Sequence, residues 1–507
     1  NRASLVYPDG KTVHYTYDAA SRLTTVTDWA GRVTTYTYDA AGRQTGMTYP
    51  NGVQTVSTYD NADRLLSIVH TSPVSGVIAS ANYTLDAAGN RLSMTDLDGL
   101  TSYTYDGLHR LTVVAYPGGE RVNYSYDPMG NRLSMVSSVY GSTTYTYDAG
   151  DRLLSYIAPS VSVNLAWDAN GNMIGKGGAV YTFDAFNRLT QVVSGTTTVQ
   201  FAYTGDGVRV GKVSGGANVT YLQDVAATLP VVLIENSGGQ AVQYVYGTDL
   251  LAEVDVAGTT SFYHADGLGS TRALSNQTGH RTNTYSYDVY GMIRAHQGSS
   301  SQFFTFAGEQ FDIDLNLQYL RARYYDPVTS RFITRDSYPA SPLNTQSVNR
   351  YSYASNTPTN LVDPSGHFPE WANNAWAWTK DAVQSNAEWV FELAIDRISP
   401  TVGDLKSTWD LFRTQEKLDK QTEARDEWSR MRIEYGSDSP QAAEAERRYN
   451  ESIWFEMPIF GPALRGLEWV HRQIVRPVYA DEGSPYDIEP GHSGGGGNWG
   501  GPPSGGK

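Results

Sequence analysis

A short phrase recurs through the first part of the chain: two tyrosines one residue apart, an aspartate, a three-residue turn, and an arginine or asparagine. One copy reads Tyr36-Thr-Tyr38-Asp39-Ala-Ala-Gly42-Arg43. Its aspartates follow one another at intervals of 16 to 26 residues, at Asp18, Asp39, Asp60, Asp86, Asp106, Asp127, Asp148, Asp168 and Asp184. A period near twenty predicts an array in which each unit packs on its neighbours, so most of these residues serve a scaffold.

Each copy of the phrase predicts a β-hairpin. Two tyrosines at positions i and i+2 lie on one face of a strand, and the Val- and Thr-rich surroundings suit a sheet. Asp-Ala-Ala-Gly is turn chemistry, in which a glycine supplies a left-handed residue, as at Gly42, Gly89, Gly130 and Gly171. Because one hairpin is not stable alone, we expect the hairpins to stack into a continuous sheet with a ladder of tyrosines on one face.

Composition excludes several classes of protein. The 507 residues carry a net charge of −15, which argues against a scaffold that binds nucleic acid. The chain has no cysteine, so disulfides and thiolate metal sites are excluded. No apolar run is long enough to span a bilayer. Asn1 lies inside a running repeat, so we expect a fragment or processed product with any targeting signal upstream.

Two further segments carry a resemblance to a known family. They are His264-Ala-Asp-Gly-Leu-Gly-Ser270 and Tyr319-Leu-Arg-Ala-Arg-Tyr-Tyr-Asp-Pro327. With the tyrosine-aspartate repeats, they resemble the RHS/YD-repeat family and its RHS repeat-associated core over residues 1–367. The resemblance implies a mainly β bacterial protein in which stacked hairpins form a hollow spiral β-shell. Related shells occur in insecticidal toxin complexes and teneurins, and the segment after the core varies and is often an enclosed toxin.

Composition changes sharply after Gly366, since nine of the eleven tryptophans but only four of the 36 tyrosines lie beyond it. Apolar residues there recur at helical spacing. The last residues are rich in Gly, Pro and Ser, which is typical of disorder. We therefore expect a YD-repeat shell over 1–260, an RHS-associated core over 261–367 that closes the shell, a helical variable domain over 368–490 and a disordered tail over 491–507.

A pair of aspartates is the sharpest chemical hypothesis. The resemblance implies that two Asp-Pro-x-Gly segments bring carboxylates together and that the shell then cuts its own backbone after the second. That second segment is intact as Asp363-Pro-Ser-Gly366, whereas the first is reduced to Asp336-Ser-Tyr-Pro339 and preceded by Arg335. We place Asp336, Asp363 and Arg335 at the self-cleavage site and the cut at His367-Phe368. The alternative is an ordinary turn in a structural plug, because aspartate also accepts bonds from its own turn amides.

Other candidate sites favour structural roles. His264 and Asp266 lack a third ligand, so we expect strand residues and no bound metal. The tyrosine ladder suits wall packing better than sugar binding. No nuclease, deaminase or protease motif stands out beyond residue 367, and no cofactor is implied. The Trp-rich segment 371–395 would suit either a membrane surface or a seal inside the shell.

Two functions remain open at the level of sequence. The first is a shell, secreted or on the surface of a bacterium, that encapsulates or presents its own C-terminal domain as a toxin or other cargo. The only enzymatic activity in this hypothesis is aspartyl-type self-cleavage. The alternative is an extracellular structural, adhesive or carbohydrate-binding protein that contacts other copies or cell-surface glycans.

Overall fold

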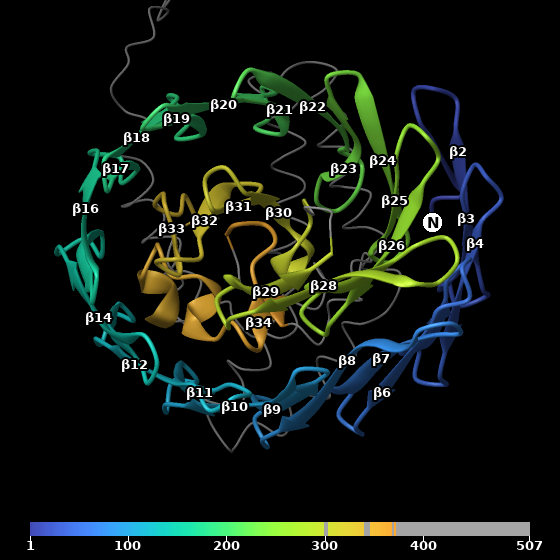
Figure 1. Ribbon diagram of the computed structural model, residues 1–507, viewed down its shortest axis with the longest axis horizontal. Coiled ribbons are helices and arrows are strands. Elements are labelled where there is room, and N and C mark those ends of the chain that lie inside the picture. The colour runs from blue at the N-terminus through green and yellow to red at the C-terminus, as the bar shows by residue number, and fades with distance from the viewer. Residues whose placement is uncertain (299–302, 339–344, 368–369, 372–507) are drawn as a thin grey trace, which may run out of the picture. The chain divides into compact units, whose positions relative to one another are not determined.

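The computed structural model describes residues 1–298, 303–338, 345–367 and 370–371 (Figure 1), all of which belong to one compact unit, Asn1–Ala394. One antiparallel sheet of 29 strands, here called the wall, occupies its larger part, and each strand pairs with the next one along the chain. The wall strands are β1 (Ser4–Val6), β2 (Thr12–Tyr17), β3 (Leu23–Thr27), β4 (Val33–Tyr38), β5 (Gln44–Thr48), β6 (Gln54–Tyr59), β7 (Leu65–Ser72), β8 (Gly76–Leu85), β9 (Arg91–Asp96), β10 (Gly99–Tyr105), β11 (Leu111–Ala115), β12 (Arg121–Tyr126), β13 (Arg132–Ser137), β14 (Gly141–Tyr147), β15 (Leu153–Ala158), β16 (Val161–Trp167), β17 (Met173–Lys176), β18 (Ala179–Phe183), β19 (Leu189–Ser194), β20 (Thr197–Tyr203), β21 (Arg209–Ser214), β22 (Ala217–Asp224), β23 (Val231–Ser237), β24 (Gln240–Tyr246), β25 (Leu250–Val254), β26 (Thr260–Ala265), β27 (Thr271–Ser275), β28 (Arg281–Tyr287) and β29 (Ile293–Gln297).

The predicted hairpins are present, and the aspartate organises each turn. Asp39 Oδ1 accepts the backbone N–H groups of Ala41 and Arg43, each at 3.0 Å, and Asp39 Oδ2 accepts Arg43 Nε at 2.7 Å. Gly42 takes the left-handed conformation, with φ of 87°. The same bonds recur at Asp18, Asp60, Asp106, Asp148 and Asp184.

Each turn is also bonded to the next turn along the wall. Arg43 Nη1 donates to the backbone carbonyl of Asp60 at 2.8 Å, and its guanidinium lies 5.2 Å from the ring centre of Tyr59. The Tyr59 hydroxyl in turn donates to the carbonyl of Gln44 at 2.9 Å. Neighbouring repeats therefore share charge-assisted bonds, which is why a single hairpin period becomes one long sheet.

Side chains alternate across the wall as strand geometry requires. In β4, Thr34 and Tyr36 are buried, whereas Thr35 and Thr37 are exposed. The first tyrosine of a pair is buried at Tyr36, Tyr103, Tyr124 and Tyr145, and the second is half-buried. The tyrosines thus pack within the unit as wall residues.

The wall curves until its later strands lie along its first ones, a contact here called the seam (Figure 1). Side chains in or directly after early strands donate to backbone carbonyls of the later strands. Tyr7 donates to the carbonyl of Tyr244, Tyr49 to that of Tyr263 at 2.6 Å, and His70 Nε2 to that of Ala265 at 2.8 Å. These bonds join strands without a shared ladder, so the seam closes the spiral.

Residues 303–367 form a compact body, here called the plug, that lies within the ring of wall strands (Figure 1). It contains a four-stranded sheet and short helical turns. Its elements are η1 (Phe306–Gly308), β30 (Gln310–Asp312), β31 (Leu317–Leu320), β32 (Arg323–Asp326), β33 (Arg331–Phe332), η2 (Thr345–Val348), η3 (Ala354–Asn356) and β34 (Leu361–Val362), the last of which pairs with β35 (Glu370–Trp371). The wall continues to Gln297, so residues 261–297, which we predicted as the start of the closing core, are wall strands.

Buried charges attach the plug to the wall. Arg209 of β21 contacts Asp312 of β30 at 2.5 Å, and neither side chain is exposed. Lys176 of β17 contacts Asp326 of β32 at 2.6 Å. The predicted helical domain at 368–490 and the tail at 491–507 lie outside the described residues, apart from Glu370 and Trp371. No helix in the described segments is both long and apolar enough to cross a bilayer.

Candidate functional site

Arg323, at the start of β32, brings the two predicted aspartates together. Its Nη2 lies 2.9 Å from Asp336 Oδ2 and 3.6 Å from Asp363 Oδ2. The guanidinium is buried and lies 3.5 Å from the ring centre of Phe332. It also donates to the carbonyls of Gly366 and Arg350. One buried cation therefore holds both carboxylates and the backbone that follows Asp363.

The two carboxylates differ in their surroundings. The Asp363 side chain is 2% exposed, and burial raises its pKa, against the opposing effect of Arg323. Its Oδ1 accepts a bond from the Ser365 hydroxyl at 3.2 Å. Burial also lowers the pKa of Arg323 to about 10. Burial thus shifts Asp363 toward its protonated form, and the nearby Arg323 opposes that shift.

Asp336 receives more donors than Asp363. Its Oδ1 accepts the backbone N–H of Tyr338 at 2.9 Å and His367 Nδ1 at 2.8 Å, while Oδ2 faces Arg323. The donors around Asp336 and the burial of Asp363 thus give the two carboxyl groups different surroundings within one site.

A second arginine, Arg321, contacts the turn after Asp363. Arg321 Nη1 donates to the carbonyl of Pro364 at 2.6 Å and to both carboxylate oxygens of Glu309, at 2.8 and 2.9 Å. Burial raises the pKa of Glu309 to about 7. Gly366 closes the turn with φ of 74°. These contacts fix the path of the backbone that leads to His367.

Arg335, predicted beside the pair, lies elsewhere. Its backbone N–H donates to the carbonyl of Gly171 at 3.1 Å, whereas the next N–H, that of Asp336, donates to the carbonyl of Arg350 at 3.1 Å. Among the described residues, no ion pair joins Arg335 to either carboxylate. Arg323 holds the pair instead. The only sequence signal for Arg323 was its place in the Tyr319–Pro327 block.

The predicted scissile bond is described on one side only. His367 lies against Asp336, and its ring centre is 5.1 Å from that of Tyr338. Phe368 lies outside the described residues. Self-cleavage at His367-Phe368 stays a prediction.

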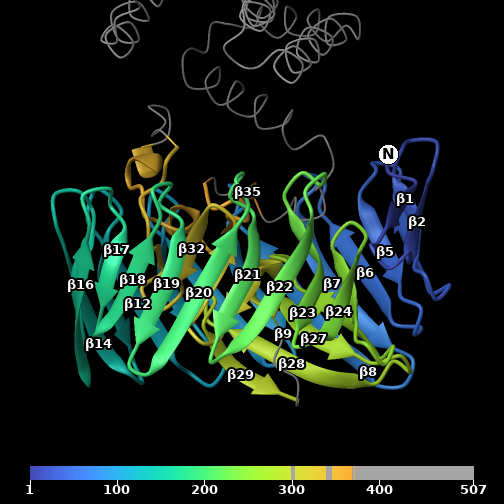
Figure 2. The same ribbon diagram turned by 90° about the horizontal axis from the view of Figure 1, so that it is seen from above.

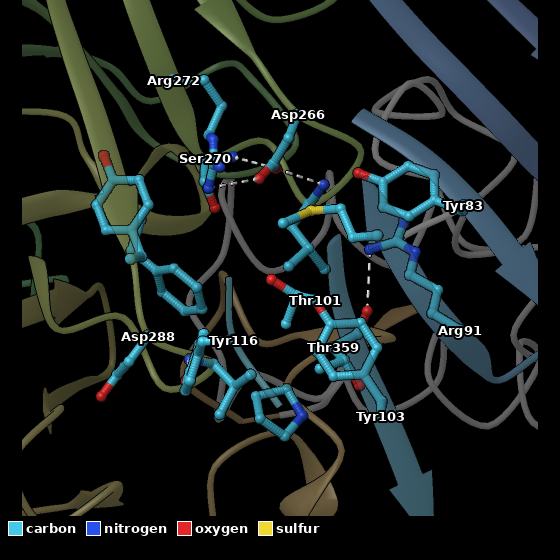
Figure 3. A pocket seen from close by; sticks show the side chains of 16 residues that line it. Tyr83, Arg91, Thr101, Tyr103, Tyr116, Asp266, Ser270, Arg272, Asp288 and Thr359 are labelled. Carbon is cyan, nitrogen blue, oxygen red and sulfur yellow. Dashed lines mark hydrogen bonds and ion pairs between the residues drawn. The ribbon is translucent and has the colours of Figure 1, made fainter. Parts of the chain in front are cut away.

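A small cavity separates the wall from the plug (Figure 3). Its volume of about 40 Å³ has room for a few water molecules. The two arginines at its edge have partners: Arg91 donates to the carbonyls of Thr359 and Gly267, and Arg272 pairs with Asp266 and Asp96. Both arginines are therefore already satisfied by protein partners.

His264 is fully buried at the seam, and its Nε2 lies 2.8 Å from the Ser275 hydroxyl oxygen. No cluster of three or more histidine, cysteine, aspartate or glutamate residues that could hold a metal ion occurs in the described part of the chain. The His264 ring packs against Tyr49 and His70, whose ring centres lie 4.8 and 5.2 Å away.

Comparison with known proteins agrees with this architecture. The teneurin YD-shell family matches residues 75–359, and the RHS repeat matches residues 1–33 and 30–55. The tRNA3(Ser)-specific nuclease WapA of Bacillus spizizenii is 28% identical over 282 residues, which cover 54% of this chain and 12% of WapA. The double-stranded DNA deaminase toxin A of Burkholderia cenocepacia is 27% identical over 330 residues, which cover 56% of this chain and 22% of the toxin.

The solved structure of TcdB2-TccC3-Cdc42 has the same fold over 73% of this chain and 22% of that one, with a TM-score of 0.53 and 18% identity. The chain spans less than a quarter of the length of each of these relatives. The match to the YD-shell covers more than half of the 507 residues and ends before Asp363. By its repeats, its spiral wall and this match, the chain belongs to the teneurin YD-shell family.

Proposed function

We propose that this chain is the closing part of a bacterial shell that encloses or presents the segment following residue 367. The plug carries this proposal, because it is bonded to the wall through buried charges and ends in a turn held by Arg321 and Arg323. That turn lies within the outline of the wall (Figure 1) and near one of its rims (Figure 2). The described plug residues therefore end inside the outline of the wall, close to a rim.

The nature of the enclosed segment is proposed by analogy. Relatives of this chain are named a tRNA nuclease, a DNA deaminase toxin and the toxin protein Tse5 of Pseudomonas aeruginosa. Tse5 is 32% identical over 107 residues, which cover 21% of this chain and 8% of Tse5. We propose a toxin-type cargo and a protein that acts outside the cell that makes it. Contacts with glycans or with other copies stay predictions.

The aspartate pair supports self-cleavage after His367. Asp336 would take a proton from a water molecule, whose oxygen then bonds to the carbonyl carbon of His367. The C–N bond to Phe368 breaks, and the proton held by Asp363 passes to the leaving amine. The products are a carboxylate end and a free amine, and the pair regains its starting protonation by exchange with water.

Intact mass measured over time on the purified full chain tests self-cleavage. We expect two fragments that meet at His367-Phe368, and a single uncut species in Asp363→Asn and Asp336→Asn. A wild-type chain that stays one species near 55.6 kDa would rule out self-cleavage. Fragmentation at the same bond in Asp363→Asn would rule out the aspartate mechanism.

Enclosure is tested separately from cleavage. Size-exclusion chromatography of the cut chain should recover both fragments together in native buffer and separate them in urea. Added protease should also spare the segment beyond residue 367 while the wall is folded. Rapid digestion of that segment in the native chain would favour the alternative of an open structural or adhesive protein.

The carbohydrate-binding alternative gains no support from the repeats. Sugar rings stack on exposed aromatic faces, but the first tyrosines of the repeated pairs are buried, as at Tyr36 and Tyr124, or half-buried, as at Tyr15. The second tyrosines are half-buried, and the rings of Tyr38, Tyr59 and Tyr126 lie against arginines. The tyrosines of the ladder are therefore engaged in packing within the wall.

A further inference from the structure

His367 bonds directly to the carboxylate that self-cleavage would use as its base. Its Nδ1 lies 2.8 Å from Asp336 Oδ1. An ionised carboxylate only accepts hydrogen bonds, so Nδ1 carries the hydrogen in this contact. His367, which precedes the predicted cut, is thus hydrogen-bonded to Asp336, the carboxylate that would activate water.

The acceptor positions of Asp336 are nearly filled. A carboxylate has about four lone-pair positions. Tyr338 N–H and His367 Nδ1 take two on Oδ1, and Arg323 takes one on Oδ2. The Tyr338 donor is a backbone group, and the Arg323 side chain is buried. The His367 side chain, in contrast, is 24% exposed. His367 is therefore the donor of the three that can leave without unfolding the site.

The turn sets His367 in this position. The His367 N–H donates to the Ser365 hydroxyl at 3.1 Å, and Gly366 lies so close to β31 that a Cβ there would be 2.4 Å from the carbonyl oxygen of Leu320. Arg323 also holds the Gly366 carbonyl. The same contacts that form the aspartate pair therefore deliver His367 to Asp336.

We propose that His367 restrains self-cleavage by occupying Asp336, so that the aspartate pair is assembled but acts only when the imidazole leaves. This inference rests on the proposed self-cleavage. A general base must contact the water that it deprotonates. While His367 donates to Oδ1, that oxygen is bonded to the imidazole and not to water.

The test compares rates of fragmentation of the full chain by intact mass. His367→Leu and His367→Ala remove the donor, and we expect each to fragment about tenfold to a hundredfold faster than wild type, the effect of losing one charge-assisted hydrogen bond. His14→Leu, on the exposed face of β2, is the matched control and should fragment at the wild-type rate. Equal thermal melting of all variants confirms that the shell stays folded.

The outcomes separate this inference from self-cleavage itself. Equal rates in wild type and both His367 variants would overturn the restraint and leave self-cleavage standing. Slower fragmentation in the variants would make His367 a participant and also overturn the restraint. No fragmentation in wild type or in either variant would overturn both. Faster fragmentation that Asp363→Asn abolishes in the His367→Leu background supports both.

Discussion

Gly366 sets the path of the backbone between Asp363 and His367. Its φ of 74° lies in the left-handed region, and an added Cβ would lie 2.4 Å from the Leu320 carbonyl oxygen and 3.0 Å from the Arg323 nitrogen. Backbone atoms of a buried strand cannot move aside cheaply. We therefore expect Gly366→Ala to lower the free energy of unfolding by about 3 kcal/mol, from strain and steric displacement together.

Gly10 provides the control for this substitution. It has a similar φ of 84°, but nothing lies within 4 Å of an added Cβ. Gly10→Ala should therefore cost about 1 kcal/mol, the left-handed penalty alone. Urea unfolding of the two variants measures the difference. Equal losses would show that the close approach to Leu320 is not a constraint.

At the scale of residues, the aspartate pair and its arginine show which parts of the site could be predicted from sequence. The resemblance pointed to Asp336 and Asp363, and both contact Arg323. Arg335 was chosen because it adjoins Asp336, but successive N–H groups at 335 and 336 bond to opposite neighbours, as in an extended chain. Adjacent side chains in such a chain point to opposite sides. Arg323 lies 13 residues before Asp336, and nothing local links the two.

At the scale of elements, the hairpin turns are of two kinds, distinguished by the residue four positions after the aspartate. Where that residue is arginine, its successor is usually a buried leucine, as at Leu23, Leu65, Leu111, Leu153 and Leu189. Where it is asparagine, its successor is a buried arginine at two of three turns, Arg91 and Arg132. These arginines donate to the plug, at the Thr359 carbonyl and the Ser330 hydroxyl. The position faces inward, so its residue type decides between core packing and attachment of the plug.

Arg209 occupies the same inward position in β21 and makes the most buried of these attachments. It pairs with Asp312 where both side chains are 0% exposed. Removing Arg209 leaves the buried Asp312 with Lys212, 3.0 Å from its Oδ1, as its remaining cation, so the carboxylate loses part of its compensation. We expect Arg209→Met to lower the free energy of unfolding by about 3 kcal/mol and Arg209→Met/Asp312→Asn to recover part of that loss.

Arg22 is the control, because it makes the outward turn bonds to Asp18 and is 33% exposed. Arg22→Met should cost about 1 kcal/mol or less. Urea unfolding gives the stabilities, and limited proteolysis shows whether residues 303–367 become susceptible first. A double variant less stable than Arg209→Met would contradict the account of a paired buried charge. The hairpins were predictable from their period, but these inward charges were not, since their partners lie about 100 residues away or more.

At the scale of the whole molecule, the family resemblance implied the hollow spiral shell that the structure shows, but the repeats themselves did not reveal the seam. Consecutive strands predicted a continuous sheet. Its closure depends on how much each hairpin bends the sheet, and the repeated phrase carries no such measure. The seam joins residues about 200 apart through single side chains, such as Tyr49 to Tyr263 and His70 to Ala265. Because these bonds are few and irregularly spaced along the chain, they produce no recognisable sequence pattern.

The seam histidines give the shell a defined response to acid. Burial lowers the pKa of His70 to about 4 and that of His264 well below its ordinary value. The unfolded chain takes up a proton on His70 as the pH falls through about 6.5, whereas the folded chain does so only near pH 4. The stability from His70 is therefore present above pH 6.5 and lost as the pH falls toward 4.

Buried acids act in the opposite direction. Burial raises the pKa of Asp249 and of Asp288 to about 6 and that of Glu309 to about 7. Their contribution to the free energy of unfolding is present below the unfolded pKa and is lost as the pH rises through 6 to 7. Through these three acids, the folded protein therefore gains stability on acidification. The wild-type pH profile mixes both signs. A variant at His70 is needed to isolate the seam.

His70→Gln isolates it, because an amide can still accept from Thr55 and donate to the Ala265 carbonyl but cannot take up a proton. Between pH 7 and pH 5, His70 should cost the wild type about 2 kcal/mol that the variant does not lose. Urea unfolding at the two pH values should therefore show a smaller acid loss, or a larger acid gain, in the variant by that amount. Parallel pH profiles would mean that His70 is protonated in the folded seam, and the seam would then hold as firmly in acid as at neutral pH.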